Sequence, residues 1–309
     1  MGIAVPRPTL LFMIGYILIL LDTSQILIAA ITTEMKMRSC EPGMLRHLFF
    51  SKILHLKKKF PKHANRVVLA LDSNNYWRKD VFEFYKGTRK KMRAKSDLDW
   101  DSIYASINEL TADLKELGIY KMVKVNRCEA DDVIAVIAKH SQENDLIQMG
   151  LEEIPEEIMI ISSDTDLAQL QKYRNIKQYS TQQKKFVTVA DPKYFMMEHI
   201  MRGDTGDGVP NILSQDNCLM EGIRQKSMTE KFIQDILSRD DPRTGLTDEQ
   251  WRNYQRNEKL VNLDFIPEEY SKAIIDTYNA APAKMDKMKL MMYMQKHKMR
   301  ILMESLNDF

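Results

Sequence analysis

The sequence predicts an α/β fold in which a mostly parallel central sheet with flanking helices is followed by a smaller helical domain. Three apolar segments each run into acidic residues, and a segment between them has apolar residues at helical spacing. Strands that alternate with helices form parallel sheets. After about residue 190 the pattern is helical and interrupted by prolines, which predicts an α/β domain at 1–190 and a helical domain at 191–309.

The composition is that of an ordinary globular chain and excludes several classes of protein. The 309 residues include 45 Lys+Arg and 43 Asp+Glu, a formal net charge of +2, and 44% are hydrophobic. With 10 Pro and 11 Gly, a collagenous or wholly disordered chain is excluded. The 3 cysteines form no CxxC pair, which argues against a disulfide framework or a cysteine zinc site and is typical of a reducing cytoplasm.

The first predicted strand is YILILL at 16–21, which ends at Asp22. It is the second half of an apolar segment at 10–21, shorter than the roughly 20 residues that a membrane span needs. A signal peptide is the alternative, but no small-residue cleavage site follows the segment. An apolar strand without polar alternation is instead typical of the interior of a parallel sheet.

The second and third predicted strands repeat this arrangement. VVLAL at 67–71 ends at an aspartate, and EIMIISS at 157–163 leads into Asp-Thr-Asp. In an open parallel sheet the carboxyl ends of neighbouring strands line one crevice. A hairpin with a polar turn at 175–189 is predicted to close the edge of the sheet. We therefore expect the acids that follow the three strands to converge, although they are far apart in the sequence: Asp22, Asp72, Asp164 and Asp166.

A crevice lined by several carboxylates needs cations, because like charges close together destabilise one another. Mg²⁺ takes oxygen ligands from carboxylates, water and substrate phosphates, and pairs of such ions serve phosphoryl transfer. The sequence therefore predicts hard divalent cations such as Mg²⁺ at this crevice, and a substrate that carries phosphate. The 6 histidines form no HxxEH or HExxH motif, and His47, His55 and His63 are expected at surface or packing positions.

The motif EADD adds three acids, Glu129, Asp131 and Asp132, at the start of a helical pattern that extends to residue 140. Acids in a first turn also complement the helix dipole without any ligand, which is the alternative interpretation. That effect accounts for one or two acids more readily than for three.

The motif GDTGDG at 203–208 places Asp204 and Asp207 three residues apart in a glycine-rich segment. By itself this motif is weak, because glycine and aspartate are favoured in solvated turns. An EF-hand loop that begins at Asp204 is excluded, since Gln215 stands where its final glutamate belongs.

Charge is distributed unevenly along the chain. Residues 51–95 contain 14 Lys+Arg and 3 acids, whereas residues 141–166 contain 8 acids and no Lys or Arg. The basic part includes YWRKDVFEFYKGTRKKMRAK at 76–95, where cations can grip phosphates and aromatic rings can stack on unpaired bases. A solvated basic helix is the alternative. Four cations have the spacing of one helix face and are predicted to bind nucleic acid: Lys86, Arg89, Lys90 and Arg93.

A second basic segment, 284–300, is rich in methionine. Methionine fills irregular gaps between packed elements, and a polar face on the same helix suits the molecular surface. We therefore predict an amphipathic packing helix here rather than a second nucleic-acid-binding helix.

The ordered set ILILLD, VVLALD, YWRKDVFEFYKGTRK, EADD, ISSDTD and GDTGDGVPNI resembles the flap endonuclease and 5′ nuclease superfamily, most closely its ribonuclease H members from T-even bacteriophages. The match covers nearly the whole chain, and the combined order of these motifs is specific. The resemblance implies an α/β nuclease domain with two Mg²⁺ sites, a basic arch at about 76–105, and a helix-loop-helix element in 191–309 that binds duplex.

The resemblance also implies roles for the acids. Asp132 would orient metal ligands or waters. Inner ligands of the first metal would be Asp72, Asp131 and Asp164, with Glu129 nearby, and the second metal would be held, partly through water, by Asp22, Asp166, Asp204 and Asp207.

For nucleic acid, the resemblance implies that Lys86 and Arg89 contact the scissile phosphate and stabilise its developing charge. Tyr85 would stack on a base, and Arg78 would help to receive the phosphate backbone. Four residues would shape the duplex-binding loop: Gly203, Gly208, Val209 and Asn211.

Two features depart from the family pattern. The family loop often has asparagine where Gly208 follows Asp207 here, which would alter ion or phosphate contacts. Residues 1–14 are unusually apolar for the family, so this leader is either specific to this protein or docks a partner.

The implied activity is that of a 5′→3′ exonuclease and flap endonuclease with ribonuclease H activity, which hydrolyses phosphodiesters from the 5′ ends of RNA–DNA and DNA duplexes. No protein nucleophile is needed. The implied role is removal of lagging-strand RNA primers during phage DNA replication in the host bacterial cytoplasm. Implied partners are duplexes with 5′ ends or flaps, a single-strand DNA-binding protein and a sliding clamp. A monomer without membrane association is expected.

Three other functions remain as alternatives. An aspartyl-phosphate phosphatase would use Asp164-Thr165-Asp166, but the small hydroxyl residue expected two positions later is Ala168. A catalytically silent protein that binds branched DNA would be expected to have lost some of its costly acids. A PIN-type ribonuclease shares the acidic crevice and would lack the basic arch and the GDTGDG element.

Overall fold

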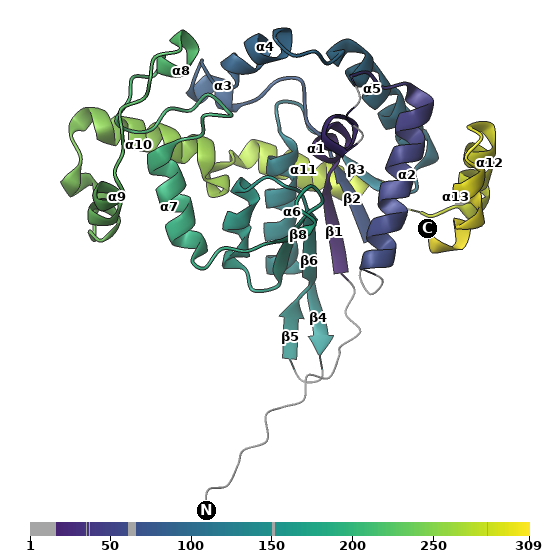
Figure 1. Cartoon of the computed structure of the whole chain (residues 1–309). Helices are drawn as coiled ribbons and strands as arrows, with labels where there is room; N and C mark the ends of the chain where they lie inside the picture. Colours follow the sequence, from purple (N-terminus) through teal and green to yellow (C-terminus); the bar gives the residue numbers. More distant parts are fainter. Residues whose placement is uncertain (1–16, 35, 37, 61–65, 150–151, 283) are drawn as a thin grey trace, which may run out of the picture.

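The structure, a computed structural model, describes residues 17–34, 36, 38–60, 66–149, 152–282 and 284–309 (Figure 1). The apolar leader at residues 1–14 and His63 lie outside these ranges. Among the described helices, none is long and apolar enough to cross a membrane. All three cysteines are buried and none of them forms a disulfide, as their spacing in the sequence suggested.

A six-stranded sheet forms the centre of the molecule, with the strand order β3-β2-β1-β6-β7-β8. Neighbours from β3 to β7 are parallel, and β8 is antiparallel to β7 in the hairpin predicted at 175–189. The mostly parallel α/β fold and its three apolar strands are thereby confirmed. The strands are β1 (Ile17–Asp22), β2 (Arg66–Ala70), β3 (Lys121–Val123), β6 (Glu157–Ile161), β7 (Ile176–Ser180) and β8 (Lys185–Val187).

The direction in which strands are added reverses beside β1. From β1 the chain adds β2 and then β3 on one side, and it later adds β6 and β7 on the other side. Leu21 near the end of β1 pairs with Leu69 on β2 and with Ile161 on β6. The carboxyl ends of β1 and β6 are therefore neighbours at a topological switch point, where open parallel sheets form ligand crevices.

One face of the sheet is covered by α2 (Pro42–Lys59) and α5 (Trp100–Leu117), with α12 (Lys287–Lys296) and α13 (Arg300–Glu304) packed outside them (Figure 1). Ile19 and Leu69 point to this face because successive strand residues alternate. Helix α5 begins where the Asp99 side chain accepts from the Ser102 N–H, and it ends at Gly118, whose φ of 63° suits glycine. The Met-rich segment buries Leu290 and Met294, which confirms the predicted packing helix.

The opposite face is covered by α6 (Ala130–Asn144) and α11 (Glu268–Ala280). Leu18 and Leu20 of β1 pack here against Val133 and Ile137, which lie four apart on one face of α6. Strands that are apolar on both faces thus account for the uninterrupted apolar segments of the sequence.

A smaller core lies to one side of the sheet, among α7 (Pro192–Arg202), α9 (Glu230–Leu237) and α10 (Asp248–Val261), while the short α8 (Cys218–Glu221) lies beside α4 (Gly87–Ala94) (Figure 1). Ile200, Ile233 and Tyr254 pack together in it. After α10 the chain returns to the two faces of the sheet through α11, α12 and α13. A fourth, small core joins Val209 and Leu260 to Phe82 and Tyr85. The residues after 190 therefore contribute to all four cores, and a division into two domains at residue 190 stays a prediction.

Short elements complete the fold above and below the sheet. At the carboxyl ends of the strands lie α1 (Thr23–Ala29), a π-helical turn (Ala30–Glu34), α3 (Arg78–Val81) and α4 (Gly87–Ala94), the last two in the predicted arch (Figure 1). A separate hairpin of β4 (Leu146–Met149) and β5 (Glu152–Pro155) was not predicted. The 3₁₀ turns are η2 (Asp166–Lys172), η3 (Pro242–Gly245), η4 (Leu263–Phe265) and η5 (Leu306–Asp308).

Candidate active site

The strands bring the predicted acids together at the switch point. Asp22 is the last residue of β1 and is 5% exposed. Its Oδ1 accepts from the Gln25 N–H at 3.1 Å and its Oδ2 accepts from the Ser162 hydroxyl at 3.1 Å, so it is held between β1 and β6. Asp72, just beyond β2, accepts from the Ala130 N–H at 3.0 Å and thereby contacts the start of α6.

Helix geometry separates the acids of EADD into two groups. Asp132 turns inward: its Oδ2 accepts from the Glu129 N–H at 2.9 Å and from the Trp77 ring N–H at 3.2 Å. Asp131, about 100° away around the helix, lines the cleft with Asp22 and Asp164. The Asp131 Oδ1 is buried and has no hydrogen-bond partner among the described residues.

The electrostatics of this group are those of a site that needs a cation. Burial, followed by the charge of Asp72, raises the pKa of Asp22 to about 8. Burial, followed by the charge of Asp166, raises the pKa of Asp164 to about 6. Burial, followed by the charges of Asp164 and Asp22, also raises the pKa of Asp131 well above its usual value. Buried carboxylates with an unpaired oxygen fit Mg²⁺, which prefers oxygen ligands. We call Asp22, Asp72, Asp131 and Asp164 the strand-end acids.

A second group lies beside the strand-end acids and includes a histidine. Asp166 at the start of η2, His199 on α7 and Asp204 in the GDTGDG loop have ligand atoms within 4.8 Å of one another. His199 Nε2 lies 2.8 Å from Asp166 Oδ1. Burial lowers the pKa of His199, but the close contact with Asp166 and the charge of that carboxylate outweigh burial and raise the pKa above its usual value.

His199 was missed in the sequence because motifs such as HExxH detect histidines whose partners lie on the same helix. Its acidic partners come from η2 and from a loop, so only tertiary structure brings them together. The sequence offered one clue to His199. It lies five residues before Asp204, in the part after residue 190 whose pattern is helical.

Two acids predicted for the second metal site have other neighbours as well. Asp22 lies with the strand-end acids, and Asp207 lines a small cavity with Asp166 and Asp204 but pairs with cations. Asp207 is surrounded by cations: it forms an ion pair with Arg89 and lies 3.5 Å from the Lys86 Nζ. Burial raises the pKa of Asp207, but Lys86 and Arg89 outweigh it and hold the pKa below its usual value. Asp22 belongs with the strand-end acids. The group around His199 therefore contains two of the four acids expected at the second metal, Asp166 and Asp204.

Two expected nucleic-acid contacts are corrected by the structure, because both side chains are buried. Arg78 is 3% exposed, donates to Glu129 Oε2 at 2.8 Å and forms an ion pair with Asp132. Tyr85 is 3% exposed, and its hydroxyl lies 2.8 Å from Glu129 Oε2 and 2.7 Å from Asp207 Oδ2. Neither side chain lines the large cleft. Both instead hold the carboxylates in place.

Three of the four cations predicted on one helix face line the cleft. Lys86 precedes α4 with a left-handed φ of 55°, and its side chain forms an ion pair with Glu129. Arg89 and Arg93 line the cleft, and Arg93 lies 5.5 Å from the centre of the Trp100 ring. Lys90 is exposed on α4, outside the cleft lining. Of the four predicted cations, Lys86 lines the cleft and pairs with an acid, Arg89 and Arg93 line the cleft, and Lys90 faces the solvent.

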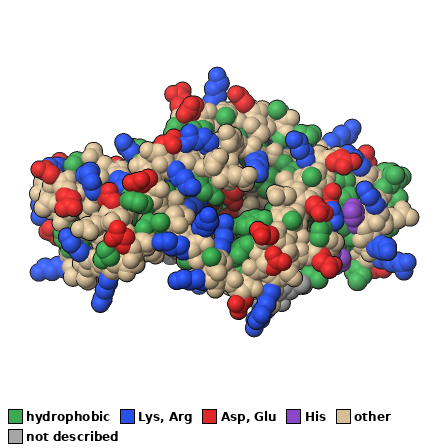
Figure 2. All heavy atoms as spheres, turned by 90° about the horizontal axis from the view of Figure 1, so that it is seen from above, with side chains coloured by type: hydrophobic (Ala, Val, Ile, Leu, Met, Phe, Trp, Pro, Cys, Tyr) green, Lys and Arg blue, Asp and Glu red, His purple; other side chains and the backbone are tan. Residues whose placement is uncertain are grey.

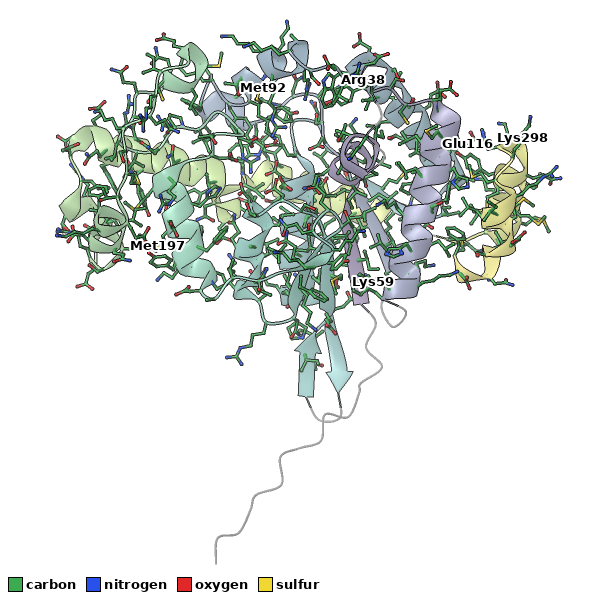
Figure 3. The ribbon with its side chains drawn as sticks, in the orientation of Figure 1. Arg38, Lys59, Met92, Glu116, Met197 and Lys298 are labelled. Atoms are coloured by element: carbon green, nitrogen blue, oxygen red, sulfur yellow. The ribbon has the colours of Figure 1, made fainter. Side chains whose placement is uncertain are left out.

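The cleft has a volume of about 880 Å³ and extends from the strand-end acids along α4 and α5. Aromatic rings of Tyr76, Trp100 and Tyr104 line it. Tyr76 belongs to the segment whose rings were predicted to stack on bases, whereas the sequence did not single out Trp100 or Tyr104. From above, acidic side chains lie at the bottom of a hollow that Lys and Arg side chains surround (Figure 2). Met92 on α4, labelled in Figure 3, lines the same cleft.

The GDTGDG loop packs closely against the turn before α4. The Lys86 N–H donates to the Asp207 carbonyl at 2.7 Å. Gly208 has a φ of +76°, and a Cβ there would lie 3.1 Å from the Phe84 carbonyl oxygen. Gly203 has a φ of +68° and faces the backbone of residues 209–210. Val209 is buried, and Asn211 accepts from the Ser214 hydroxyl, so these residues shape the loop from within.

Comparisons with known proteins match this chain along nearly its whole length. The 5′-3′ exonuclease N-terminal resolvase-like domain family matches residues 17–199, and the T4 RNase H C-terminal family matches residues 190–309. The ribonuclease H of Enterobacteria phage T4 is 30% identical over 300 residues, which cover 94% of this chain and 95% of that protein.

Solved structures share the fold. A phage T5 flap endonuclease in a pseudo-enzyme-product complex with DNA and metal ions superposes with a TM-score of 0.57 at 17% identity, covering 85% of this chain and 99% of that one. The T5 5′-exonuclease with bound zinc has a TM-score of 0.57 at 16% identity and covers 86% and 99%. The motif resemblance is thus confirmed, and the chain belongs to the 5′-3′ exonuclease family of nucleases.

Proposed function

We propose that this nuclease is Mg²⁺-dependent and acts 5′→3′ as an exonuclease and flap endonuclease with ribonuclease H activity. The observation that carries the proposal is the group of strand-end acids at the bottom of a cleft whose sides carry Arg89, Arg93 and three aromatic rings. Acids at the bottom suit metal ions, and cations with aromatic rings suit a nucleic-acid strand. The T4 and T5 relatives named above support the same class of reaction.

In this proposal the acids would hold two metal ions. The strand-end acids would hold one ion, and Asp166 and Asp204 would contribute to the other. Bound Mg²⁺ supplies an activated water and neutralises phosphate charge. Glu129 and Asp132 would act through neighbours, since Glu129 pairs with Lys86 and Arg78, and Asp132 fixes Arg78. Mn²⁺ would substitute for Mg²⁺.

The chain's own cations would position the substrate. Arg89 and Arg93 would grip the phosphate backbone in the cleft, and Lys86 would approach the scissile phosphate from its place beside Glu129. Tyr76 and Trp100 would stack on unpaired bases, which gives no sequence preference. The loop at 203–208 would present the backbone that duplex DNA contacts.

The proposed substrates are DNA and RNA–DNA duplexes with 5′ ends or flaps, and the proposed role is removal of lagging-strand RNA primers in an infected cell's cytoplasm. A single-strand DNA-binding protein and a sliding clamp are proposed partners, and the proposed nuclease works as a monomer.

The decisive experiment is cleavage of internally labelled duplexes that carry a recessed 5′ end, a 5′ flap or an RNA primer. We expect short 5′ products with Mg²⁺ and none with a chelator. Asp131→Asn should lower the cleavage rate at least 1,000-fold, on the order of 4 kcal/mol of lost transition-state stabilisation, while DNA binding persists. Asp240→Asn, at an exposed position on the far helical side, is the matched control and should cleave normally.

Two results would contradict the proposal. Tight binding of branched DNA without any cleavage would make the chain a silent DNA-binding protein. Cleavage of single-stranded RNA with equal rates from both ends would favour the PIN-type alternative.

A further inference from the structure

We propose that His199 is a nitrogen ligand of the second metal site, so that this site favours transition-metal ions over Mg²⁺. The inference rests on the proposed metal-dependent function. It adds a ligand that none of the acidic motifs contains, and it distinguishes the two sites chemically.

The distances in this group suit metal coordination. Ligand atoms about 2.1 Å from an octahedral ion and at right angles to each other lie about 3.0 Å apart. The His199 Nε2 lies 2.8 Å from Asp166 Oδ1, and both lie within 4.8 Å of an Asp204 carboxylate oxygen. These three side chains can therefore reach a single ion without any rearrangement of the backbone.

Neighbouring groups hold the His199 ring, the Asp204 carboxylate and the Asp166 backbone in the arrangement that brings their ligand atoms together. The His199 ring lies against the Phe195 ring, with planes 22° apart, one turn earlier on α7. Asp204 Oδ1 accepts from the Gly206 N–H at 2.7 Å, which fixes that carboxylate in the loop. The Asp166 N–H donates to Asp164 Oδ1 at 2.9 Å, which connects this group to the strand-end acids.

The composition of the two groups implies different metal preferences. The strand-end acids offer oxygen ligands, which Mg²⁺ prefers. An imidazole nitrogen adds affinity for later first-row ions such as Co²⁺ and Zn²⁺, whose complexes with nitrogen ligands are more stable. The alternative is that His199 only forms an ion pair with Asp166 and never contacts a metal.

The test uses Co²⁺ on the full chain and does not depend on cleavage. One equivalent of Co²⁺, added in the presence of millimolar Mg²⁺, should produce a strongly shifted, solvent-exchangeable imidazole N–H resonance in the proton NMR spectrum. This resonance should be absent in His199→Gln and retained in His47→Gln, an exposed histidine on α2. Calorimetry should show at least a tenfold loss of Co²⁺ affinity in His199→Gln, with Mg²⁺ affinity changed less than twofold.

The outcomes separate this inference from the proposed function. Co²⁺ binding without a shifted imidazole resonance, or equal affinities in the two variants, would overturn the role of His199 and leave the metal-dependent nuclease intact. Failure of wild type to bind any divalent ion would overturn both. If His199→Gln does not fold, wild-type protein labelled with ¹⁵N-histidine provides the test. The shifted resonance must then split, because its proton is bonded to a labelled histidine nitrogen.

Discussion

At the scale of single residues, the site depends on side chains that never reach the substrate. Tyr85 places one hydroxyl between Glu129 and Asp207, and Arg78 places one guanidinium between Glu129 and Asp132. The Arg78 charge and the Tyr85 hydroxyl prevent these buried carboxylates from remaining unpaired, which would be costly. These two residues lie in the segment predicted to bind nucleic acid, and a cation and an aromatic ring are the kinds of side chain that such a role requires. Their orientation depends on packing against α10 and on the GDTGDG loop.

Tyr85→Phe should therefore lower both stability and activity. The variant keeps the ring but removes a hydrogen bond to a charged group, and the expected loss is about 1–3 kcal/mol in the free energy of unfolding. Cleavage should also slow. The Tyr85 hydroxyl contacts Asp207, and Asp207 in turn forms an ion pair with Arg89, so the loss of the hydroxyl disturbs the position of Arg89. Urea unfolding and single-turnover cleavage measure the two effects.

Tyr120→Phe is the matched control for that variant. The Tyr120 hydroxyl is buried and has no hydrogen-bond partner among the described residues, so its loss should change stability by less than about 0.5 kcal/mol or raise it. Equal losses in the two variants would show that the contacts of the Tyr85 hydroxyl have no special energetic role.

At the scale of elements, the arch and the GDTGDG loop act as one unit. The turn that carries Lys86 contacts residues 207–208 through a backbone hydrogen bond and a close approach at Gly208. The family pattern allows asparagine at this position, and asparagine tolerates a positive φ better than other side chains. The conformation of the loop therefore accounts for glycine at position 208. From the sequence alone, this departure from the family pattern was expected to alter ion or phosphate contacts.

Gly208→Ala tests this coupling. Its φ of +76° and a Cβ placed 3.1 Å from the Phe84 carbonyl should cost about 1–2 kcal/mol of stability and shift the turn that carries Lys86. We expect a lower kcat in steady-state cleavage, together with a lower denaturant midpoint. In contrast, Gly43→Ala near the start of α2, where a Cβ meets open space, should be neutral or stabilising. An unchanged kcat in Gly208→Ala would argue that the loop and the arch are independent.

At the scale of the whole molecule, the sheet gathers negative charge at one edge, and cations of the segment 78–89 pair with part of that charge. Folding without metal must bury carboxylates that would ionise freely in the unfolded chain. Burial is the chief cause that raises the pKa of the Asp22 carboxyl from its ordinary 3.8 to about 8 in the folded protein. Between these pH values the folded state binds more protons than the unfolded state, so stability falls as the pH rises.

Metal-free protein should therefore have a lower Tm at pH 8 than at pH 6, and Mg²⁺ should raise the Tm more at pH 8. Differential scanning calorimetry with chelator and with Mg²⁺ measures both effects. Asp22→Asn removes the titrating group and should reduce the pH dependence. A Tm in chelator that rises from pH 6 to pH 8, or one that responds equally in Asp22→Asn, would contradict the assignment of this charge to the strand-end acids.

Local sequence patterns were sufficient to predict the parallel sheet, its polar hairpin and the convergence of four acids. A strand buried on both faces must be apolar throughout, and parallel strands must end at a common edge. For the same reason, Asp22, Asp72, Asp164 and Asp166 were expected at one edge of the sheet. The first three line the cleft together, whereas Asp166 lies in the neighbouring group with His199 and Asp204.

Tertiary packing decided which charges face the cleft and which are buried beneath it. Asp131 and Asp132 are adjacent in the chain, yet one lines the cleft and the other pairs with Arg78, because a helix turns about 100° per residue against its neighbours. His199 joined Asp166 and Asp204 only because α7 packs beside η2. Periodicity and motifs describe one element at a time, whereas these partners come from separate elements, and so only the folded chain could bring them together.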